Sequence, residues 1–425
     1  MPPATTSADV LVVGGGPAGL ALSLLLLKSG ATVALMEKSR SLEREYRGEI
    51  LQPGGQAVLD RLGVLRGARD RGAYPHDGFQ LVAGERVLLD SDYRRLPGPY
   101  NCLLSLPQAH LLAELLTACT AYPGFHHLPG TRLSSLLTED GRVRGARGTG
   151  PDGAQEVRAQ VVAGADGRHS KVRSLAGIGS VRQESFDQDV LWFKLPAPDP
   201  PPAGSRQSVQ VYRGSGAPVL VYRSYPDSVQ VGWTLPHGGY REVAALGIAH
   251  IRDRIAAAVP QHAAAVHDTL RGPGDLTLLD VFASQAERWA VDGLVLLGDS
   301  AHTHGPIGAQ GINLALQDAV LLHPVLMDSL RTGDATAAFL SRFERARRPA
   351  IASVLRLQAM QGKAMLSGNS LASAVRPVVA RAVARTPLYH RILHKLAYGA
   401  MPVPVRDDLF TAPSPRPSEG PRPCA

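Results

Sequence analysis

The sequence has few cysteines, few aromatic residues and no long apolar run. Its cysteines are Cys102, Cys119 and Cys424, too few and too scattered for a disulfide framework or a zinc site. No uninterrupted apolar run reaches the ~18 residues that a membrane-spanning helix requires. The chain starts at Met1 without a basic residue before Asp9, so a secretory signal peptide is not expected. These absences favour a cytoplasmic protein.

The charge balance is positive, but it does not point to nucleic acid. The chain has 425 residues, of which 44% are hydrophobic and 19% are charged, and its formal net charge is +8. That length and apolar fraction fit a folded protein of roughly two or three domains. The basic residues are spread along the chain and form no dense cluster with interleaved aromatics, so a nucleic-acid partner is not expected.

A glycine-rich turn lies between a strand pattern and a helical pattern near the start of the chain. The run 9–13 predicts a buried strand, 14–19 (GGGPAG) a tight turn, and the leucine-rich segment after it a helix that ends near Gly30. The three spaced glycines permit the turn, the approach of a pyrophosphate and close packing of helix and strand. A turn that only packs is the alternative. The motif predicts a dinucleotide site at Gly14, Gly16, Pro17, Ala18 and Gly19, with Glu37 on the adenosine ribose.

Two later motifs indicate which dinucleotide binds. One is 164–173 (GADGRHSKVR), and the other is 298–313 (GDSAHTHGPIGAQGIN). In the second, a buried strand places Asp299 where its carboxylate can accept hydrogen bonds from a ribitol chain, which FAD has and NAD lacks. The turn-rich loop after it leads into a helix that begins near Gly311. Such a helix start can stabilise negative charge on a reduced flavin.

The three motifs, in this order and spacing, resemble those of the FAD-dependent aromatic hydroxylases, which are single-component flavoprotein monooxygenases with the para-hydroxybenzoate hydroxylase fold. The resemblance covers most of residues 9–345. It implies an α/β fold, with a Rossmann-like FAD-binding domain, an inserted mixed or antiparallel β-sheet substrate domain and a helical C-terminus. On this plan the FAD-binding domain comprises 1–75, 101–180 and 286–345, and the substrate domain comprises 76–100 and 181–285. Residues 346–410 form a C-terminal helical region, and 411–425 a disordered tail. Within the helical region the sequence predicts breaks at Pro349, Pro377 and Pro387.

The resemblance also implies roles for single residues. Arg47 contacts the cofactor near the flavin, Gln108 contacts the pyrophosphate or ribityl chain, and the backbone of Leu133 touches adenine. Asp166 belongs to the motif linked to both FAD and NADPH, and Asp299 binds ribitol. The complete predicted cofactor site is Gly14, Gly16, Pro17, Ala18, Gly19, Glu37, Lys38, Arg47, Gln108, Leu133, Asp166, Gly298, Asp299, Pro306, Gly308, Gly311, Ile312 and Asn313.

The activity implied by the resemblance is a monooxygenase reaction. NAD(P)H reduces FAD, the reduced flavin adds O2 to give a C4a-hydroperoxide, and one oxygen atom passes to a hydrophobic aromatic or polycyclic small molecule. Ring hydroxylation, as on polyketide- or terpenoid-like compounds, is the main expectation. The stretch 48–55 (GEILQPGG) is similar to one in squalene epoxidases, so alkene epoxidation is an alternative. A flavin reductase or dehydrogenase that does not use O2, or a flavoprotein that only binds a ligand, are others.

No catalytic acid or base can be assigned from the sequence. The aromatic and histidine residues of the strand-rich segment that could contact substrate are Tyr212, Tyr222, Trp233 and His237, for which ordinary packing is the competing interpretation. His302 and His304 lack a third ligand of plausible spacing, so no metal is expected. Near the C-terminus, 375–401 mixes basic and apolar residues. This pattern allows weak peripheral contact with a membrane, although a solvated helix face is the favoured interpretation.

Overall fold

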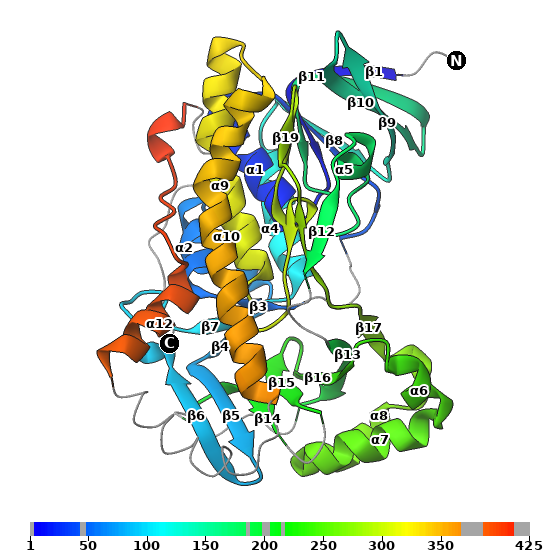
Figure 1. Ribbon diagram of the computed structural model, residues 1–425, viewed down its shortest axis with the longest axis vertical. Helices are drawn as coiled ribbons and strands as arrows, with labels where there is room; N and C mark the ends of the chain where they lie inside the picture. Colours follow the sequence, from blue (N-terminus) through cyan, green and yellow to red (C-terminus); the bar gives the residue numbers. More distant parts are fainter. Residues whose placement is uncertain are drawn as a thin grey trace.

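The computed structural model of the chain describes residues 4–42, 48–183, 188–197, 205–213, 217–366 and 386–411. In this structure two β-sheets lie at opposite ends of an elongated molecule, and two long helices run along one side (Figure 1). The predictions for Arg47, for a helix break at Pro377 and for the tail from residue 412 onwards lie outside the described residues.

The first sheet begins with the strand–turn–helix–strand unit that the glycine motif predicts. Val10 of the first strand pairs in parallel with Val33 of the next. Val10, Leu11 and Val12 are fully buried, as expected for a parallel sheet that is covered on both faces. The central order is β19-β20-β11-β1-β2-β8, and β9 and β10 extend the sheet from β11. The bounds of the unit and of the other strands are β1 Ala4–Val13, α1 Pro17–Lys28, β2 Val33–Glu37, β8 Phe125–Pro129, β9 Arg132–Glu139, β10 Arg142–Gly150, β11 Gly153–Gly164, β19 Ala290–Val291 and β20 Leu294–Leu296.

Helices cover this sheet and extend towards the second one. Helix α1 packs against α4 (Gln108–Thr120) and α9 (Gly311–Thr332), and α10 (Ala337–Leu366) lies beside α9 (Figure 1). A helix break was predicted at Pro349, and that prediction is wrong, because Pro349 lies inside α10. Ala350 and Ile351, which follow it, are buried, and this packing compensates for the backbone hydrogen bond that a proline removes.

The second sheet has the order β17-β13-β16-β15-β14-β5-β6. It is mixed, because β14 pairs in parallel with β5 while its other pairs are antiparallel. Its strands come from the two separate segments that the sequence predicts for a substrate domain. Their bounds are β5 Gly78–Ala83, β6 Arg86–Asp92, β13 Gln188–Pro196, β14 Ser208–Tyr212, β15 Val219–Ser224, β16 Ser228–Pro236 and β17 Thr277–Leu279.

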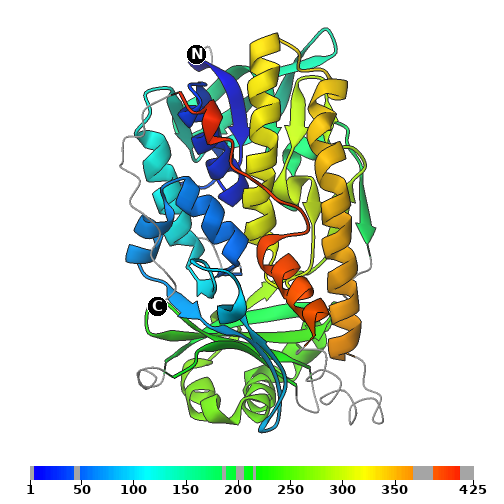
Figure 2. The same cartoon turned by 90° about the vertical axis from the view of Figure 1, so that its left-hand side faces the viewer.

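Three helices lie within this strand-rich segment, where the sequence predicts only strands. They are α6 (Tyr240–Ala245), α7 (Gly247–Ala258) and α8 (Ala263–Thr269). They lie beneath the sheet in Figure 2, and Ile251, Ile255 and Val266 form a core with one face of the sheet. The other face of the sheet is directed towards the first domain.

Short elements join the two sheets. One three-stranded sheet contains β3 (Ile50–Leu51), β7 (Leu103–Ser105) and β4 (Tyr74–His76), and another contains β12 (Ser180–Gln183), β18 (Ala283–Ala286) and β21 (His302–Thr303). The remaining short helices of the described chain are α2 (Pro53–Arg61), α3 (Leu65–Asp70) and α5 (Lys171–Leu175), with 3-10 turns η1 (Tyr93–Arg95), η2 (Pro260–His262), η3 (Pro273–Asp275), η4 (Gly298–Ser300) and η5 (Asp407–Leu409).

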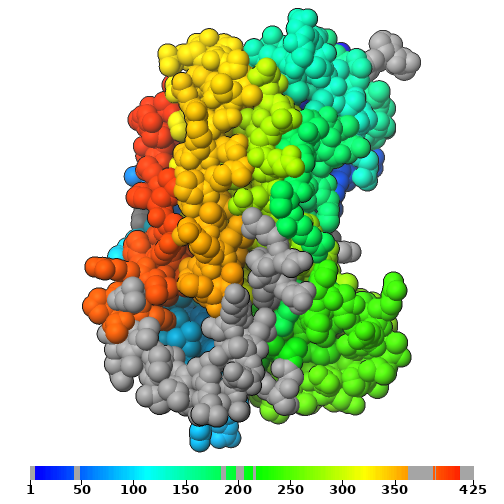
Figure 3. Space-filling model, viewed as in Figure 1, coloured from blue at the N-terminus to red at the C-terminus, as the bar shows by residue number. Residues whose placement is uncertain are grey.

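The described C-terminal segment returns along the molecule from the second sheet to the first. Helix α12 (Pro387–Tyr398) begins at a proline, as the sequence predicts, and buries Leu393 and Ala397. The chain then runs to Thr411, whose backbone N–H donates to the carbonyl of Lys28 at the end of α1. On the visible face of Figure 3, α10 and α12 form much of the surface. None of the helices in the described ranges combines the length and apolar character that a membrane crossing needs. Membrane contact and the domain boundaries stay predictions.

Candidate functional site

The glycine turn brings the backbone of three segments close together. Gly14 has φ +111°, and a Cβ placed there would lie 2.4 Å from the carbonyl oxygen of Ala165. A Cβ on Gly19 would lie 1.9 Å from the carbonyl oxygen of Gly14. Side chains are therefore excluded at both positions. Helix α1 begins directly after this turn, so its unpaired N–H groups and positive dipole end are presented beside open space.

Glu37 lies at the edge of the same turn. One of its carboxylate oxygens accepts a hydrogen bond from the backbone N–H of Gly15 at 2.6 Å, and the other from that of Ser39 at 2.9 Å. The residue is 8% exposed. The two backbone bonds fix the carboxylate at the end of β2, where it lines the cavity described below.

Asp166 holds the second motif in shape. One carboxylate oxygen accepts hydrogen bonds from the backbone N–H groups of Lys171 (2.6 Å) and Val172 (3.0 Å) at the start of α5. The other accepts from the hydroxyls of Ser170 (2.5 Å) and Ser300 (3.1 Å). Because Ser300 belongs to the third motif, this carboxylate ties together two segments that are far apart in the sequence.

Behind the third motif lies a buried charge cluster that the sequence analysis missed. Asp318 of α9 accepts from His302 (2.7 Å), from Arg347 of α10 (2.7 Å) and from the backbone N–H of Gly298 (2.9 Å). Burial alone would raise the pKa of Asp318, but the charges of His302 and Arg347 outweigh burial and lower it to about 2. The ionised carboxylate thus anchors the loop that carries Asp299. The signal that could have indicated this cluster is the single acidic residue Asp318 within the mostly apolar helical segment 312–322.

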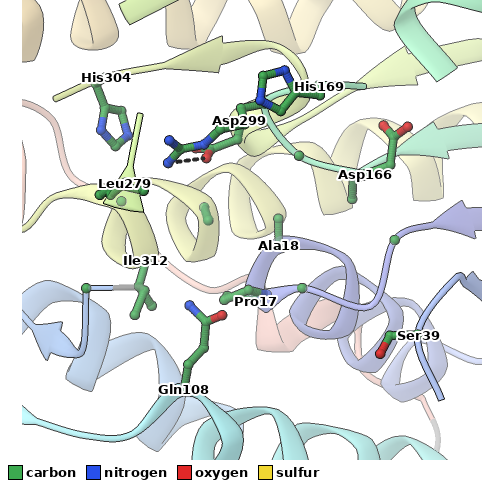
Figure 4. A pocket seen from close by; sticks show the side chains of 18 of the residues that line it. Pro17, Ala18, Ser39, Gln108, Asp166, His169, Leu279, Asp299, His304 and Ile312 are labelled. Carbon is green, nitrogen blue, oxygen red and sulfur yellow. Dashed lines mark ion pairs between the residues drawn. The ribbon is translucent and has the colours of Figure 1, made fainter. Parts of the chain in front are cut away.

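Asp299 faces the cavity rather than the core. Its carboxylate lies 3.8 Å from the guanidinium of Arg168, a pair that Figure 4 marks with a dashed line. Arg168 also donates to the backbone carbonyl of Asp280 at 2.9 Å, so it joins the second motif to the segment after β17. His304 lies on the same side of the cavity in this view. Burial lowers the pKa of His304, with the nearby Asp299 acting in the opposite direction, and the ring is therefore neutral at pH 7.

The loop before α9 is fixed by side-chain amides. Asn313 accepts from the backbone N–H of Gln52 at 3.0 Å and donates to the carbonyl of Ala309 at 2.9 Å. Gln52 donates in turn to the carbonyl of Gly308 at 2.8 Å. Asn313, 1% exposed, therefore shapes the loop beneath the cavity surface. The same packing requires a glycine at 55, since a Cβ there would lie 2.3 Å from Asn313 Oδ1.

These segments enclose a cavity of about 790 Å³ that extends from the first sheet to the second. It gathers most of the predicted cofactor residues, although they come from six separated parts of the chain. Four predicted cofactor residues do not line it: Gly19, Gly298, Gly308 and Asn313. Those that line it are Gly14, Gly16, Pro17, Ala18, Glu37, Lys38, Gln108, Leu133, Asp166, Asp299, Pro306, Gly311 and Ile312.

The far end of the cavity is formed by one face of the second sheet. Trp192, Leu220 and Tyr222 line it, together with the 277–279 strand and Val281. Burial raises the pKa of Tyr222 well above its ordinary value, and the Glu49 carboxylate acts in the same direction. The phenol is therefore protonated at neutral pH. Of the four predicted substrate contacts, Tyr222 is the one that the structure places in this wall.

The other three predicted substrate residues lie away from the cavity. Trp233 and Tyr212 pack against the core that the sheet forms with α7 and α8, because alternate residues of a strand point to opposite faces. His237 lies at the end of β16, where its Nδ1 is 3.0 Å from the Asp189 carboxylate.

The cavity has the features that FAD requires. At one end, the α1 N-terminus and a turn without side chains fit a pyrophosphate. In the middle, the amide oxygen of Gln108 is buried without a hydrogen-bond partner among the described residues, and Figure 4 shows this side chain pointing into the space between Pro17 and Ile312. A hydroxyl-bearing chain would satisfy that oxygen. The other end is apolar and reaches the second sheet.

Comparisons with known proteins agree with this arrangement. A family model of the FAD binding domain matches residues 7–358. The 6-methylpretetramide 4-monooxygenase of Streptomyces rimosus is 57% identical over 403 residues, which is 95% of this chain and 95% of that protein.

Among solved structures, the p-nitrophenol 4-monooxygenase of Pseudomonas putida DLL-E4 has a TM-score of 0.77 at 21% identity, covering 94% of this chain and 100% of that one. The anhydrotetracycline hydroxylase of Streptomyces rimosus has a TM-score of 0.68 at 24% identity, covering 92% and 76%. At these identities the two structures show a shared fold.

Proposed function

Because this chain belongs to the family of FAD-dependent aromatic hydroxylases, we propose that it hydroxylates one ring of a fused-ring aromatic polyketide of the 6-methylpretetramide type. The observation that carries this proposal is the 57% identity to 6-methylpretetramide 4-monooxygenase across 95% of both chains. The enzyme is a flavin monooxygenase, which uses NAD(P)H and O2 as co-substrates.

We propose that the first end of the cavity binds the adenosine and pyrophosphate of FAD. The N–H groups at the start of α1 would hold the phosphates, and Glu37 and Leu133, which line this end, would contact the ribose and adenine. Gln108 and Asp299, on opposite sides in Figure 4, would contact the ribityl chain. When bound, FAD supplies the hydride acceptance and oxygen activation that amino-acid side chains lack.

The apolar end of the cavity would hold the substrate. Trp192, Leu220 and Ile50 offer apolar surface there, which favours flat aromatic rings and excludes water from the reacting atoms. Exclusion of water matters because it protects the activated oxygen from loss as H2O2.

Tyr222 would orient the substrate. Its phenol stays protonated because burial raises its pKa, so it can donate a hydrogen bond to a substrate oxygen but cannot act as a base at neutral pH. A hydrogen bond of this kind fixes which ring carbon faces the flavin. Tyr222 would therefore orient the substrate without acting as a base.

The test uses the purified, FAD-loaded protein with NADPH, 6-methylpretetramide and ¹⁸O₂. We expect NADPH consumption to depend on substrate, and we expect mass spectrometry to show a product that has gained one labelled oxygen atom. Reduction of the flavin without labelled product would contradict the monooxygenase reaction on this substrate. A labelled product from p-nitrophenol but not from 6-methylpretetramide would reject the proposed substrate class.

A further inference from the structure

Four residues form a row across the floor of the substrate end of the cavity. In the second sheet Thr277 pairs with Trp192, Trp192 pairs with Gly232, and Gly232 pairs with Leu220. Directly paired residues point to the same face of a sheet. Thr277, Trp192 and Leu220 line the cavity, and Gly232 lies between them without a side chain.

The indole of Trp192 covers the gap at Gly232. A Cβ on Gly232 would lie 2.7, 2.9 and 3.0 Å from three adjacent atoms of the six-membered indole ring. An approach to the ring edge would make the outer two distances clearly longer than the middle one, so the backbone of Gly232 meets the ring face. The indole therefore lies flat on β16, and any side chain at 232 would displace it. Trp192 is also one of the residues that line the cavity.

The same indole carries an unused hydrogen-bond donor. Trp192 is 4% exposed, and its Nε1 is buried without a hydrogen-bond partner among the described residues. A buried donor without an acceptor destabilises a protein, and Trp is normally buried where its N–H finds a partner. Because Trp192 lines the cavity, an acceptor that arrives with the ligand is the partner that would satisfy this N–H.

We propose that Trp192 determines substrate specificity: its indole face stacks on a fused aromatic ring, and its N–H donates to a carbonyl or phenol oxygen of that ring system. Gly232 is required because it lets the indole lie flat. This inference rests on the proposed function, and it narrows the substrate to planar polycyclic compounds that carry an oxygen beside the stacked ring. Trp192 binds and selects the substrate and takes no part in the transfer of oxygen.

The test measures binding to the FAD-loaded protein through the perturbation of the flavin absorbance, with 1-naphthol and naphthalene as probes. These two probes share a fused ring frame and differ by one oxygen. For Trp192→Phe, which keeps an aromatic face but lacks the N–H, we expect 1-naphthol to bind roughly five- to tenfold more weakly. Naphthalene should bind within about twofold of its wild-type affinity, because it has no acceptor to lose.

A second variant and a control separate stacking from folding. Gly232→Ala should weaken both probes, because the added Cβ pushes the indole into the cavity. Trp233→Phe is the matched control, since Trp233 is on the neighbouring position of the same strand but faces the helices; it should leave both affinities unchanged. Flavin content and melting temperature are measured for each variant to confirm folding.

Several outcomes would overturn the inference. They are equal weakening of both probes by Trp192→Phe, wild-type binding of both probes by Gly232→Ala, and a wild-type protein that does not prefer 1-naphthol to naphthalene. Failure of the proposed function is distinguishable from these, because it would appear as normal probe discrimination without oxygenation of 6-methylpretetramide.

Discussion

At the scale of single residues, three aspartates in or beside the second and third motifs have different tasks. The Asp166 carboxylate accepts hydrogen bonds from backbone N–H groups of its own motif and from a hydroxyl of the third motif. The Asp318 carboxylate accepts hydrogen bonds from a buried arginine and a buried histidine. Asp299 instead faces the cavity, with Arg168 at 3.8 Å. The first two shape the site, and the third is placed to meet a ligand.

Removal of the Asp299 carboxylate should therefore weaken FAD binding while the fold persists. For Asp299→Ala we expect an affinity loss of about tenfold to a hundredfold, as for charged hydrogen bonds worth ~1.5–3 kcal/mol. The ratio of flavin to protein absorbance after gel filtration measures it. Asp268→Ala, on an exposed position of α8, is the control. Full flavin content in Asp299→Ala would refute the assigned role.

Single residues of β13 also show what could not be predicted from the sequence. Alternation on β13 separates Trp192, which faces the cavity, from Phe193, which packs in the helix-covered core. Both are aromatic residues in one apolar run, so composition cannot tell which face binds a ligand. That choice depends on strand pairing and on the helices behind the sheet, which are long-range features.

At the scale of elements, α9 connects the cavity to the rest of the first domain. It begins after the loop that carries Pro306 and Gly308, and it carries Asp318 in its first half. It also packs His323 against the end of α1, where Nε2 is 2.8 Å from the hydroxyl of Ser29. Burial, with a smaller contribution from the charge of Arg406, lowers the pKa of His323 from 6.5 to about 4. The ring is thus neutral in the folded protein at neutral pH.

This buried histidine should make stability depend on pH. His323 binds a proton near pH 6.5 in the unfolded chain and only near pH 4 in the folded chain. The contribution of the neutral ring to the free energy of unfolding is therefore complete above pH 6.5 and is lost as the pH falls towards 4. We expect a loss of about 2 kcal/mol in the free energy of unfolding between pH 8 and pH 5 from one such group. Urea unfolding at several pH values measures it.

His323→Gln should reduce the slope of the unfolding free energy against pH. His267→Gln, on an exposed position of α8, should not. Part of the slope will remain in His323→Gln, because burial also lowers the pKa of His76 to about 4. A slope in His323→Gln identical to that of the wild type would show that His323 does not change its protonation on unfolding.

The elements were unequally predictable from the sequence. The unit of β1, α1 and β2 was predictable because its glycines, its periodicity and its terminal Glu37 are local signals. Helices α6 to α8 were not predicted, since the segment that contains them is dominated by alternating strands. Pro349 was interpreted as a helix break by a local rule, but tertiary packing of α10 against its neighbours overrides it.

At the scale of the whole molecule, the cavity is the place where the two sheets meet. Each end contributes a different kind of surface: a charged and glycine-lined end from the first sheet, and an apolar end from the second. A ligand that spans both should stabilise the complete fold, because binding to the native state alone shifts the unfolding equilibrium.

FAD should therefore raise the stability of the apoprotein by about 2.7 kcal/mol at a hundredfold excess over its dissociation constant. Thermal unfolding followed by circular dichroism measures the effect. FMN is the control, because it has the ring system and ribityl chain but lacks the adenosine that the β1–α1 turn and Glu37 are expected to bind. Equal stabilisation by FMN would show that the contacts of the β1–α1 turn and Glu37 with adenosine do not contribute to binding.

The buried contact of Arg347 with Asp318 has a consequence for biosynthesis. Asp318 anchors the loop that bears Asp299, and its cationic partner lies on α10, late in the chain. During translation the pigment site thus stays incomplete until most of the polypeptide has left the ribosome. A premature stop before Arg347 would yield a product that remains colourless however much riboflavin the host is fed.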